Sequence, residues 1–388
     1  MYIHIRKPLF SSIYAFILLF GYTSNALAQK KLQETGLYKQ FISSEKDSSR
    51  NPKFLVFPVL GYAQETGLQY GLTGSMIFYM DKMDSSIRSS SVNTYATLTT
   101  KHQANFKAQA DLWLPENKYH LMGEVRYRHY PFSFYGIGAN TWDADKDLLI
   151  QQLFRVALEG EKRVSPYWYT GVSLRYEYYQ YEDKTPDGLF DRNLYYGSAG
   201  GHYLAFGLTQ SFDKRNSVTY TTQGSLARMK VSYAPDLWGK DNYVGGKVEL
   251  DLRQFFRISP KFTLGLNGVL HSMIAKNVPF YLLPELGNDQ MMRGYYQGRY
   301  RHKNMLAIQS EIRYRIHPRI GAAAFGGIGT VSPALDQIKD IKPSFGAGLS
   351  YFFDLEHESS VRFDYGFGEQ RPGEKRQSGF YISMGQAF

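Results

Sequence analysis

Apolar and polar residues alternate along most of the chain. In residues 304–316, Ile308 and Ile312 fall at even positions, while Glu311 and Arg313 fall at odd positions. The same alternation marks residues 104–114, 168–180, 243–253 and 361–367. A period of two predicts β-strands that have one apolar and one polar face.

Counting such runs predicts about sixteen strands. An even number of strands places both ends of the chain on the same side of a barrel, as single-chain bacterial barrels require. The expected strands are 53–61, 67–80, 89–101, 103–114, 118–128, 149–164, 167–181, 202–212, 217–233, 242–257, 261–275, 304–316, 319–330, 343–353, 360–368 and 378–388.

The charged faces of these strands predict an all-β fold, a transmembrane antiparallel β-barrel over residues 53–388. A soluble sandwich would bury these charges in its core at a high cost in free energy. In a membrane barrel the apolar face meets lipid and the polar face lines the lumen. The alternative, a large soluble all-β protein, explains neither the charged inner faces nor the lengths of the connections.

The connections alternate in length. Short turns alternating with longer outer loops are typical of outer-membrane barrels, in which the short turns are periplasmic. The short connections lie near 115–118, 165–166, 213–216, 259–261 and 317–319, and the longer ones near 129–148, 182–201, 234–241, 276–303, 331–342 and 369–377.

The first residues predict a cleaved secretory signal peptide. Arg6 and Lys7 precede an uncharged apolar stretch at 8–22, and Ala26 and Ala28 fit a small-x-small cleavage site. This order is typical of a signal peptide. The alternative is a membrane anchor helix, for which the apolar stretch is shorter than a span requires.

Cleavage would remove residues 1–28 and leave a polar stretch at 29–52 before the first strand. So short a stretch cannot form an independent domain, which usually needs about 50 residues or more. We therefore expect a flexible periplasmic leader followed by a barrel in the outer membrane of a Gram-negative bacterium.

Composition narrows the classes of function. The chain has no Cys, which excludes disulfide scaffolds, cysteine zinc sites and iron–sulfur clusters. Its aromatic content of 16% suits the membrane interface, where Tyr and Trp are favoured. The net charge of +10 favours contact with anionic lipids or lipopolysaccharide over nucleic acid.

No enzyme signature is present. The nine His residues are scattered, and the chain has no HExxH, GxSxG or P-loop motif. Ser211 and His202 share a strand but lie nine positions apart, so we interpret them as ordinary strand residues. We expect no catalytic residue, no cofactor and no metal; an outer-membrane enzyme is the least favoured class.

The last run resembles the C-terminal signal of bacterial outer-membrane barrels. Phe380, Ile382, Met384 and Phe388 share one face by parity, and the run ends on Phe. Gln386 departs from the apolar residue usual at its position. The signal indicates a barrel and not a particular function.

The longest connection, between the eleventh and twelfth strands, carries a more specific motif. Its Arg293-Gly294-Tyr295 resembles the Arg-Gly-(Tyr/Phe) motif of the loop that folds into the lumen in the BamA/TamA family. The following strand supplies Glu311 and Arg313. Weaker blocks that resemble the family lie at 58–62 with 65–67, at 134–138, and at 213–216 with Gly224.

A guanidinium in a partly dehydrated lumen needs a carboxylate or carbonyl partner. We expect Arg293 to pair with the inward-facing Glu311 and hold the loop inside the barrel, while Gly294 permits a tight turn. The alternative is an extracellular loop whose Arg is solvated. The family's Asp in the strand after next is replaced here by Gly327, so we expect one carboxylate partner instead of two.

The seam between the first and last strands is the second functional feature. Pro58 removes a backbone donor from the first strand, and Gly379 and Gly385 weaken the last. Such a seam can open and expose edges that template an incoming strand. The alternative is that Pro58 merely sits near the barrel rim.

The resemblance implies a short family member without POTRA domains that assists insertion or assembly of outer-membrane components. Its expected partners are outer-membrane lipids, lipopolysaccharide, client outer-membrane proteins and a periplasmic protein that replaces the POTRA domains. The alternative is a passive pore or surface-exposed barrel that keeps the fold without the insertase activity.

Overall fold

The computed structural model describes residues 49–63, 67–239 and 242–388. The expected signal peptide with Ala26 and Ala28, most of the leader, and the turn of the first hairpin lie outside these residues. The signal peptide and the flexible leader therefore stay predictions from the sequence.

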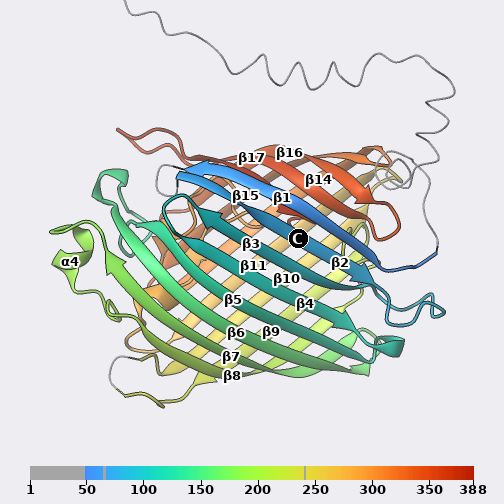
Figure 1. Cartoon of the computed structure of the whole chain (residues 1–388), viewed down its shortest axis with the longest axis horizontal. Coiled ribbons are helices and arrows are strands. Elements are labelled where there is room, and N and C mark those ends of the chain that lie inside the picture. Colours follow the sequence, from blue (N-terminus) through green and yellow to red (C-terminus); the bar gives the residue numbers. More distant parts are fainter. Residues whose placement is uncertain (1–48, 64–66, 240–241) are drawn as a thin grey trace, which may run out of the picture. The chain divides into compact units, whose positions relative to one another are not determined.

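Sixteen strands form one antiparallel sheet in which each strand pairs with its neighbour in the chain (Figure 1). This confirms the predicted all-β architecture and the even number of strands. The strands are β1 (Lys53–Ala63), β2 (Gly67–Phe78), β3 (Ser90–Thr99), β4 (Ala104–Trp113), β5 (Tyr119–Phe134), β6 (Asp147–Ser165), β7 (Trp168–Asp183), β8 (Gly201–Asp213), β9 (Gly224–Ala234), β10 (Gly245–Arg257), β11 (Phe262–Ile274), β14 (Asn304–His317), β15 (Ile320–Ser332), β16 (Lys342–Asp354), β17 (Ser359–Phe367) and β18 (Ser378–Met384).

The remaining elements are small. Strands β12 (Glu285–Leu286) and β13 (Tyr300–Arg301) pair with each other inside the connection from β11 to β14. Helix α4 (Leu189–Asn193) lies in the loop between β7 and β8. Single 3₁₀ turns occupy Pro115–Asn117, Asp143–Asp145, Phe280–Leu282 and Leu335–Gln337. Within the described ranges, no helix is long and apolar enough to cross a membrane.

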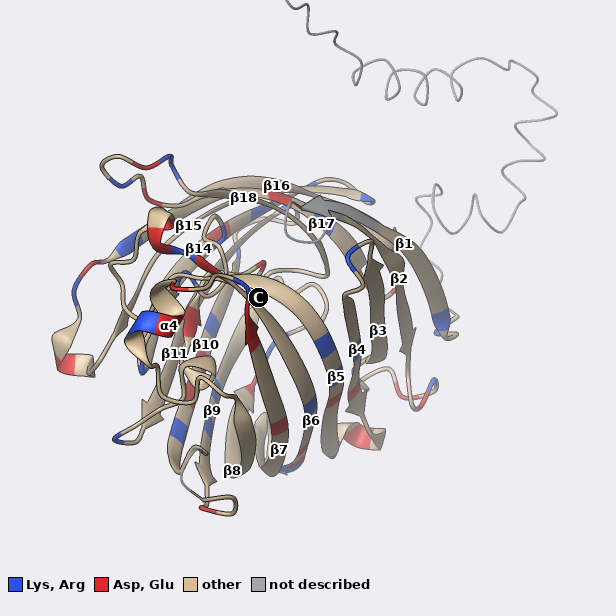
Figure 2. Cartoon of the chain, turned by 60° about the vertical axis from the view of Figure 1, so that its left-hand side comes forward, with Lys and Arg blue, Asp and Glu red and all other residues tan. Residues whose placement is uncertain are grey.

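The sheet curls into a ring (Figure 2), and the exposures of alternate residues place its polar face inside. On β14, Ile308 and Ile312 are 57% and 48% exposed, whereas Glu311 and Arg313 are 1% and 2% exposed. The alternation therefore separates an apolar outer face from a charged inner face, as period-two strands require. Blue and red bands recur along β5, β6, β7, β9 and β10 in Figure 2.

The two ends of the ring carry different connections. The loops 135–146, 184–200, 275–303, 333–341 and 368–377 meet at one end, on the left in Figure 1 beside α4. The opposite end carries the tight turns at 166–167, 258–261, 318–319 and 355–358 and two longer connections at 79–89 and 214–223.

Three predicted strands differ from the structure by four residues or more. The strand expected at 118–128 continues to Phe134, because its ladder with β6 extends as far as Asp147. The strand expected at 217–233 begins at Gly224, because Ser217 and Thr221 form a local turn: the Thr221 hydroxyl donates to Ser217 O at 2.7 Å. Such side-chain bonds compete with a strand ladder. The strand expected at 378–388 ends at Met384, because Gly385 has a left-handed φ of +74° that a strand does not accommodate.

The sheet has two edges, β1 and β18. Over the described residues, no ladder of hydrogen bonds joins them. The first residue of β1 instead reaches the turn after β16, where Lys53 Nζ lies 3.9 Å from Asp354 Oδ1 and 3.6 Å from Glu356 Oε2. The rings of Phe57 and Phe353 lie 5.5 Å apart. Side chains therefore connect the first strand to the β16–β17 hairpin.

Candidate functional site: the lumenal loop and the last hairpin

The loop from 275 to 303 carries its own apolar cluster. Buried side chains of the loop pack against the ends of β14 and β15 that lie next to the loop. This packing removes apolar surface from water and fixes the loop against the wall. The cluster consists of Leu286, Met291, Met292, Tyr295 and Tyr300 from the loop and Met305, Ala307 and Val331 from the strands.

Arg293 lies at the centre of this site and is 1% exposed. Its Nη2 is 2.5 Å from Glu311 Oε2, and its Nη1 is 2.7 Å from Asp364 Oδ2. The guanidinium also lies 3.4 Å from the ring centroid of Phe325. The structure thus brings Arg293 and Glu311 together, and it corrects the expectation of a single carboxylate: the second partner comes from β17.

Glu311 connects the loop to a second arginine. Arg313 does not bind the loop; its Nε donates to Glu311 Oε1 at 2.7 Å. Its Nη2 donates to the main-chain oxygen of Phe388 at 2.7 Å, and its Nη1 to Thr221 O at 3.2 Å. Glu311 is therefore shared between two guanidiniums, and Arg313 bridges it to the segment after β18.

Gly294 is a position where only glycine fits. Its φ is +110°, and a Cβ there would lie 2.5 Å from the carbonyl carbon of Phe367. The Gly294 N–H donates to the Tyr381 hydroxyl at 2.9 Å, which joins the loop to β18. Burial raises the pKa of the neighbouring Tyr295, so its hydroxyl stays protonated and donates to Pro343 O at 2.5 Å.

Five further residues complete this site, and the motif search did not single them out for it. Asp364 pairs with Arg293, and Arg362 Nε lies 2.5 Å from the same Asp364 oxygen. Arg362 also donates to Asp289 O of the loop at 2.5 Å. The Ser383 hydroxyl on β18 donates to Asp289 Oδ2 at 2.8 Å, and Tyr381 accepts from Gly294. The period-two alternation of residues 361–367 predicts that Arg362 and Asp364 face the lumen, and this is the only sign of their role in the sequence.

Residues 385–388 turn into the lumen. The Gly385 N–H donates to Ser360 O at 2.7 Å, and the side chains of Ala387 and Phe388 are buried beside Phe255. An added Cβ at Gly265 would lie 2.9 Å from the Phe388 ring. Phe388 therefore occupies a fitted space between β10, β11 and Arg313.

This placement differs from the single face expected for the barrel signal. Phe380 and Ile382 are 61% and 62% exposed on the outer face, whereas Met384 is half-buried and Phe388 is 6% exposed inside. The alternation between outer and inner faces stops at Gly385, because its left-handed conformation changes the direction of the residues that follow.

Truncating Phe388 should loosen this end of the chain. We expect Phe388→Ala to lower stability by about 1.5–3 kcal/mol, the value of burying one such side chain. Hydrogen exchange at residues 385–388 should increase more than elsewhere. The matched control is Phe380→Ala, which removes the same ring from the outer face; equal protection of the segment in both variants would contradict the lumenal placement.

The three seam residues lie on the two edge strands. Pro58 is exposed on the outer face in the middle of β1, opposite Leu72 of β2. Gly379 lies near the start of β18 opposite Gly366, and Gly385 follows its end. Pro58 is the sixth of the eleven residues of β1, so it does not lie at the rim of the barrel.

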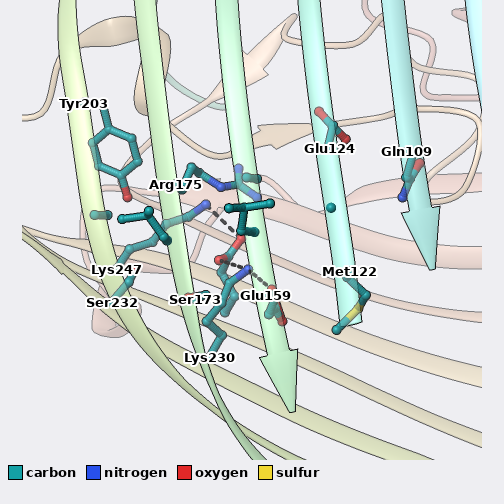
Figure 3. A pocket seen from close by; sticks show the side chains of 16 residues that line it. Gln109, Met122, Glu124, Glu159, Ser173, Arg175, Tyr203, Lys230, Ser232 and Lys247 are labelled. Carbon is teal, nitrogen blue, oxygen red and sulfur yellow. Dashed lines mark hydrogen bonds and ion pairs between the residues drawn. The ribbon is translucent and has the colours of Figure 1, made fainter. Parts of the chain in front are cut away.

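Away from the loop, the inner wall is a network of ion pairs (Figure 3). Lys230 Nζ lies 3.4 Å from Glu159 and 3.3 Å from Glu249, and Lys247 lies 2.8 Å from Glu249. These groups line a cavity of about 160 Å³. Among the described residues, no three His, Cys, Asp or Glu side chains are arranged to hold a metal ion.

Comparison with known proteins agrees with this architecture. The model of the Omp85 superfamily domain matches residues 86–388. The fold is similar to BamA from Haemophilus ducreyi lacking POTRA domains 1–3, with a TM-score of 0.53, 14% identity, and coverage of 86% of this chain and 70% of that one. It is also similar to CdiB from Acinetobacter baumannii, with a TM-score of 0.53, 16% identity and coverage of 85% of this chain.

The chain spans 59% of the length of CdiB. The comparison with curated proteins gives no match. The superfamily match extends over more than half of the residues and includes the lumenal loop, both of its carboxylate partners and the last hairpin. The chain therefore belongs to the Omp85 superfamily.

Proposed function

We propose that this protein is an outer-membrane barrel that assists the insertion or assembly of other outer-membrane components through the seam between β1 and β18. The observation that carries the proposal is that these two edge strands share no ladder over the described residues. Unpaired strand edges present rows of donors and acceptors to which an incoming strand can add.

The lumenal loop supports the proposal because it contacts the last hairpin directly. Arg293 binds Asp364 of β17, and Gly294 and Asp289 bind Tyr381 and Ser383 of β18. In this proposal the loop holds β18 in place while β1 remains available. The seam can then change its width without loss of the rest of the sheet.

Export, location and partners belong to the same proposal. A cleaved signal peptide at 1–28 would send the chain to the outer membrane, where its apolar outer face meets lipid and lipopolysaccharide. Clients would be unfolded outer-membrane proteins, which a periplasmic protein would deliver. The activity needs no catalytic residue and no cofactor.

Depletion of the protein tests this function. We expect particular barrels or lipids to disappear from the outer-membrane proteome and lipidome, while their periplasmic precursors accumulate. A variant with Arg257→Ala, an exposed position on β10, should restore them as well as the natural chain does. An unchanged outer membrane after full depletion would argue against the proposal.

The second candidate is a passive pore that keeps the fold without insertase activity. The lumenal cavities favour it, since two of them measure about 560 and 570 Å³. Conductance in planar bilayers separates the two functions. A lumen occupied by the loop predicts small, flickering currents, and an open pore predicts large, steady ones.

Replacing Pro58 should alter the seam without harming the fold. Pro58→Val restores a backbone donor and a residue that favours strands, so we expect a more stable β1 and less exchange of added strand peptides at the edge. The measurement is crosslinking of a labelled amphipathic strand peptide to the purified barrel. Crosslinking that matches the natural chain would count against a role of Pro58 in opening.

A further inference from the structure

A second cavity inside the ring carries excess positive charge. It has a volume of about 560 Å³, within the range of about 300–1,000 Å³ typical of small-molecule sites. It lies between the inner wall of β5–β7, strands β10 and β11, and the loop 275–303, and it shares Arg175, Tyr203 and Lys247 with the wall in Figure 3.

The charges that line this cavity do not balance. Three carboxylates face six basic side chains, which leaves a net charge of +3. The carboxylates are Glu177, Glu249 and Glu285, and the basic residues are Arg126, Arg128, Arg155, Arg175, Lys247 and Arg301. Around Glu159 and Glu249, by contrast, Lys230 and Lys247 pair with the carboxylates.

The excess is concentrated on β5 and β6. Arg155 is well paired, with Glu177 at 2.5 Å and Glu124 at 3.2 Å. Arg126 lies directly across from Arg155 in the strand register. Its Nε lies 3.6 Å from Glu124 Oε1, the same oxygen that Arg155 contacts. Like charges placed opposite one another in a sheet are destabilising.

Arg128 has no carboxylate partner among the described residues. Two positions from Arg126 on the same strand face, it has no ion pair within the part of the chain that the structure describes; its guanidinium carbon lies 5.0 Å from the Tyr130 ring. The Nε atoms of Arg126 and Arg128 are both buried without a hydrogen-bond partner. Both side chains are otherwise partly exposed to the cavity, so an anion there could accept from their guanidinium groups.

From this geometry we infer that the cavity beside Arg126 and Arg128 binds a multivalent oxyanion, a phosphate group. The planar donors of arginine match tetrahedral and planar oxyanions in a bidentate way, which a spherical chloride does not allow. The net charge of +3 favours an anion that carries more than one charge. The site is independent of the seam, so its test does not depend on the proposed function.

The phosphate can be free or part of a lipid head group, and the experiment distinguishes these sources. The full chain in detergent without lipid is titrated with inorganic phosphate at constant ionic strength, with chloride as the reference, by calorimetry and by thermal unfolding. We expect saturable binding and a rise in the unfolding temperature with phosphate alone. A response only to lipopolysaccharide would assign the site to a lipid phosphate.

Variants tie the response to the site. Arg128→Gln should weaken phosphate binding by about tenfold or more, as the loss of a charge-assisted bidentate contact requires. Arg128→Lys keeps the charge but loses the planar pair of donors, so its affinity for phosphate should lie between those of the natural chain and Arg128→Gln. The matched control is Arg253→Gln on β10, whose arginine is paired with Asp251 at 2.5 Å and does not line this cavity.

Two outcomes would overturn the inference. One is a response to neither phosphate nor lipopolysaccharide beyond that to chloride. The other is binding that Arg128→Gln and Arg253→Gln reduce equally, since that would reflect general attraction to a basic barrel. Heat-dependent gel mobility verifies beforehand that each variant is folded.

Discussion

Replacing Arg293 with alanine should release the lumenal loop and destabilise the barrel by about 3–5 kcal/mol, the cost of breaking a buried ion pair from one side. The substitution takes one of two guanidinium partners from each fully buried carboxylate, so Glu311 keeps only Arg313 and Asp364 keeps only Arg362. Urea unfolding in detergent measures the loss of stability. Protease cleavage within 285–303 measures the release of the loop.

Three comparisons make this result specific. Arg293→Lys keeps the charge without the planar pair of donors, so its stability should lie between those of the natural chain and Arg293→Ala. Adding Glu311→Gln or Asp364→Asn to the alanine variant should lower its stability further, because the buried Arg313 or Arg362 then loses its carboxylate. Arg257→Ala, at an exposed site, should change stability by less than about 0.5 kcal/mol. A buried loop in Arg293→Ala would contradict the assigned role.

Linking β1 covalently to the β16–β17 hairpin should abolish the proposed insertion activity while leaving the barrel folded. Because the chain has no cysteine, a pair at Phe57→Cys and Phe353→Cys is unique, and the two native rings lie 5.5 Å apart. A short thiol crosslink there fixes the edge of the sheet. Cells that depend on the variant should lose the affected outer-membrane proteins, and a reducible linker should restore them.

The matched control places the same crosslink away from the seam. Phe262 and Tyr314 are register partners on β11 and β14, with ring centroids 4.5 Å apart. Linking them adds the same chemistry between strands that are already paired, so activity should remain. Full activity of the Phe57–Phe353 crosslinked form would count against a seam that opens at β1.

Local sequence patterns were enough to predict most of the fold. The strands follow from a period of two, which each run displays within its own residues, so β14 was predicted to within one residue of its bounds. The same period gave the inward phase of Glu311 and hence its approach to Arg293. These features need no knowledge of residues far away in the chain.

Contacts across the lumen were harder to predict. Asp364 lies 71 residues from Arg293 and faces it only because the curvature of the ring brings β17 opposite the loop. The inner phase of Asp364 was visible, but its partner was not. The inward turn at Gly385 was also unforeseen, since a left-handed glycine ends a strand without disturbing the alternation that precedes it.

The bridge through Arg313 has a thermodynamic consequence. Glu311 holds Arg293 on one side and Arg313 on the other, and Arg313 holds the main-chain oxygen of Phe388. If this chain of contacts couples the two segments, linkage makes the effect reciprocal: loosening residues 385–388 must weaken the loop by the same free energy by which freeing the loop weakens residues 385–388. A double-mutant cycle between Arg293 and Phe388 gives that coupling energy directly. Any ligand that displaces one segment would then act on the other at a distance.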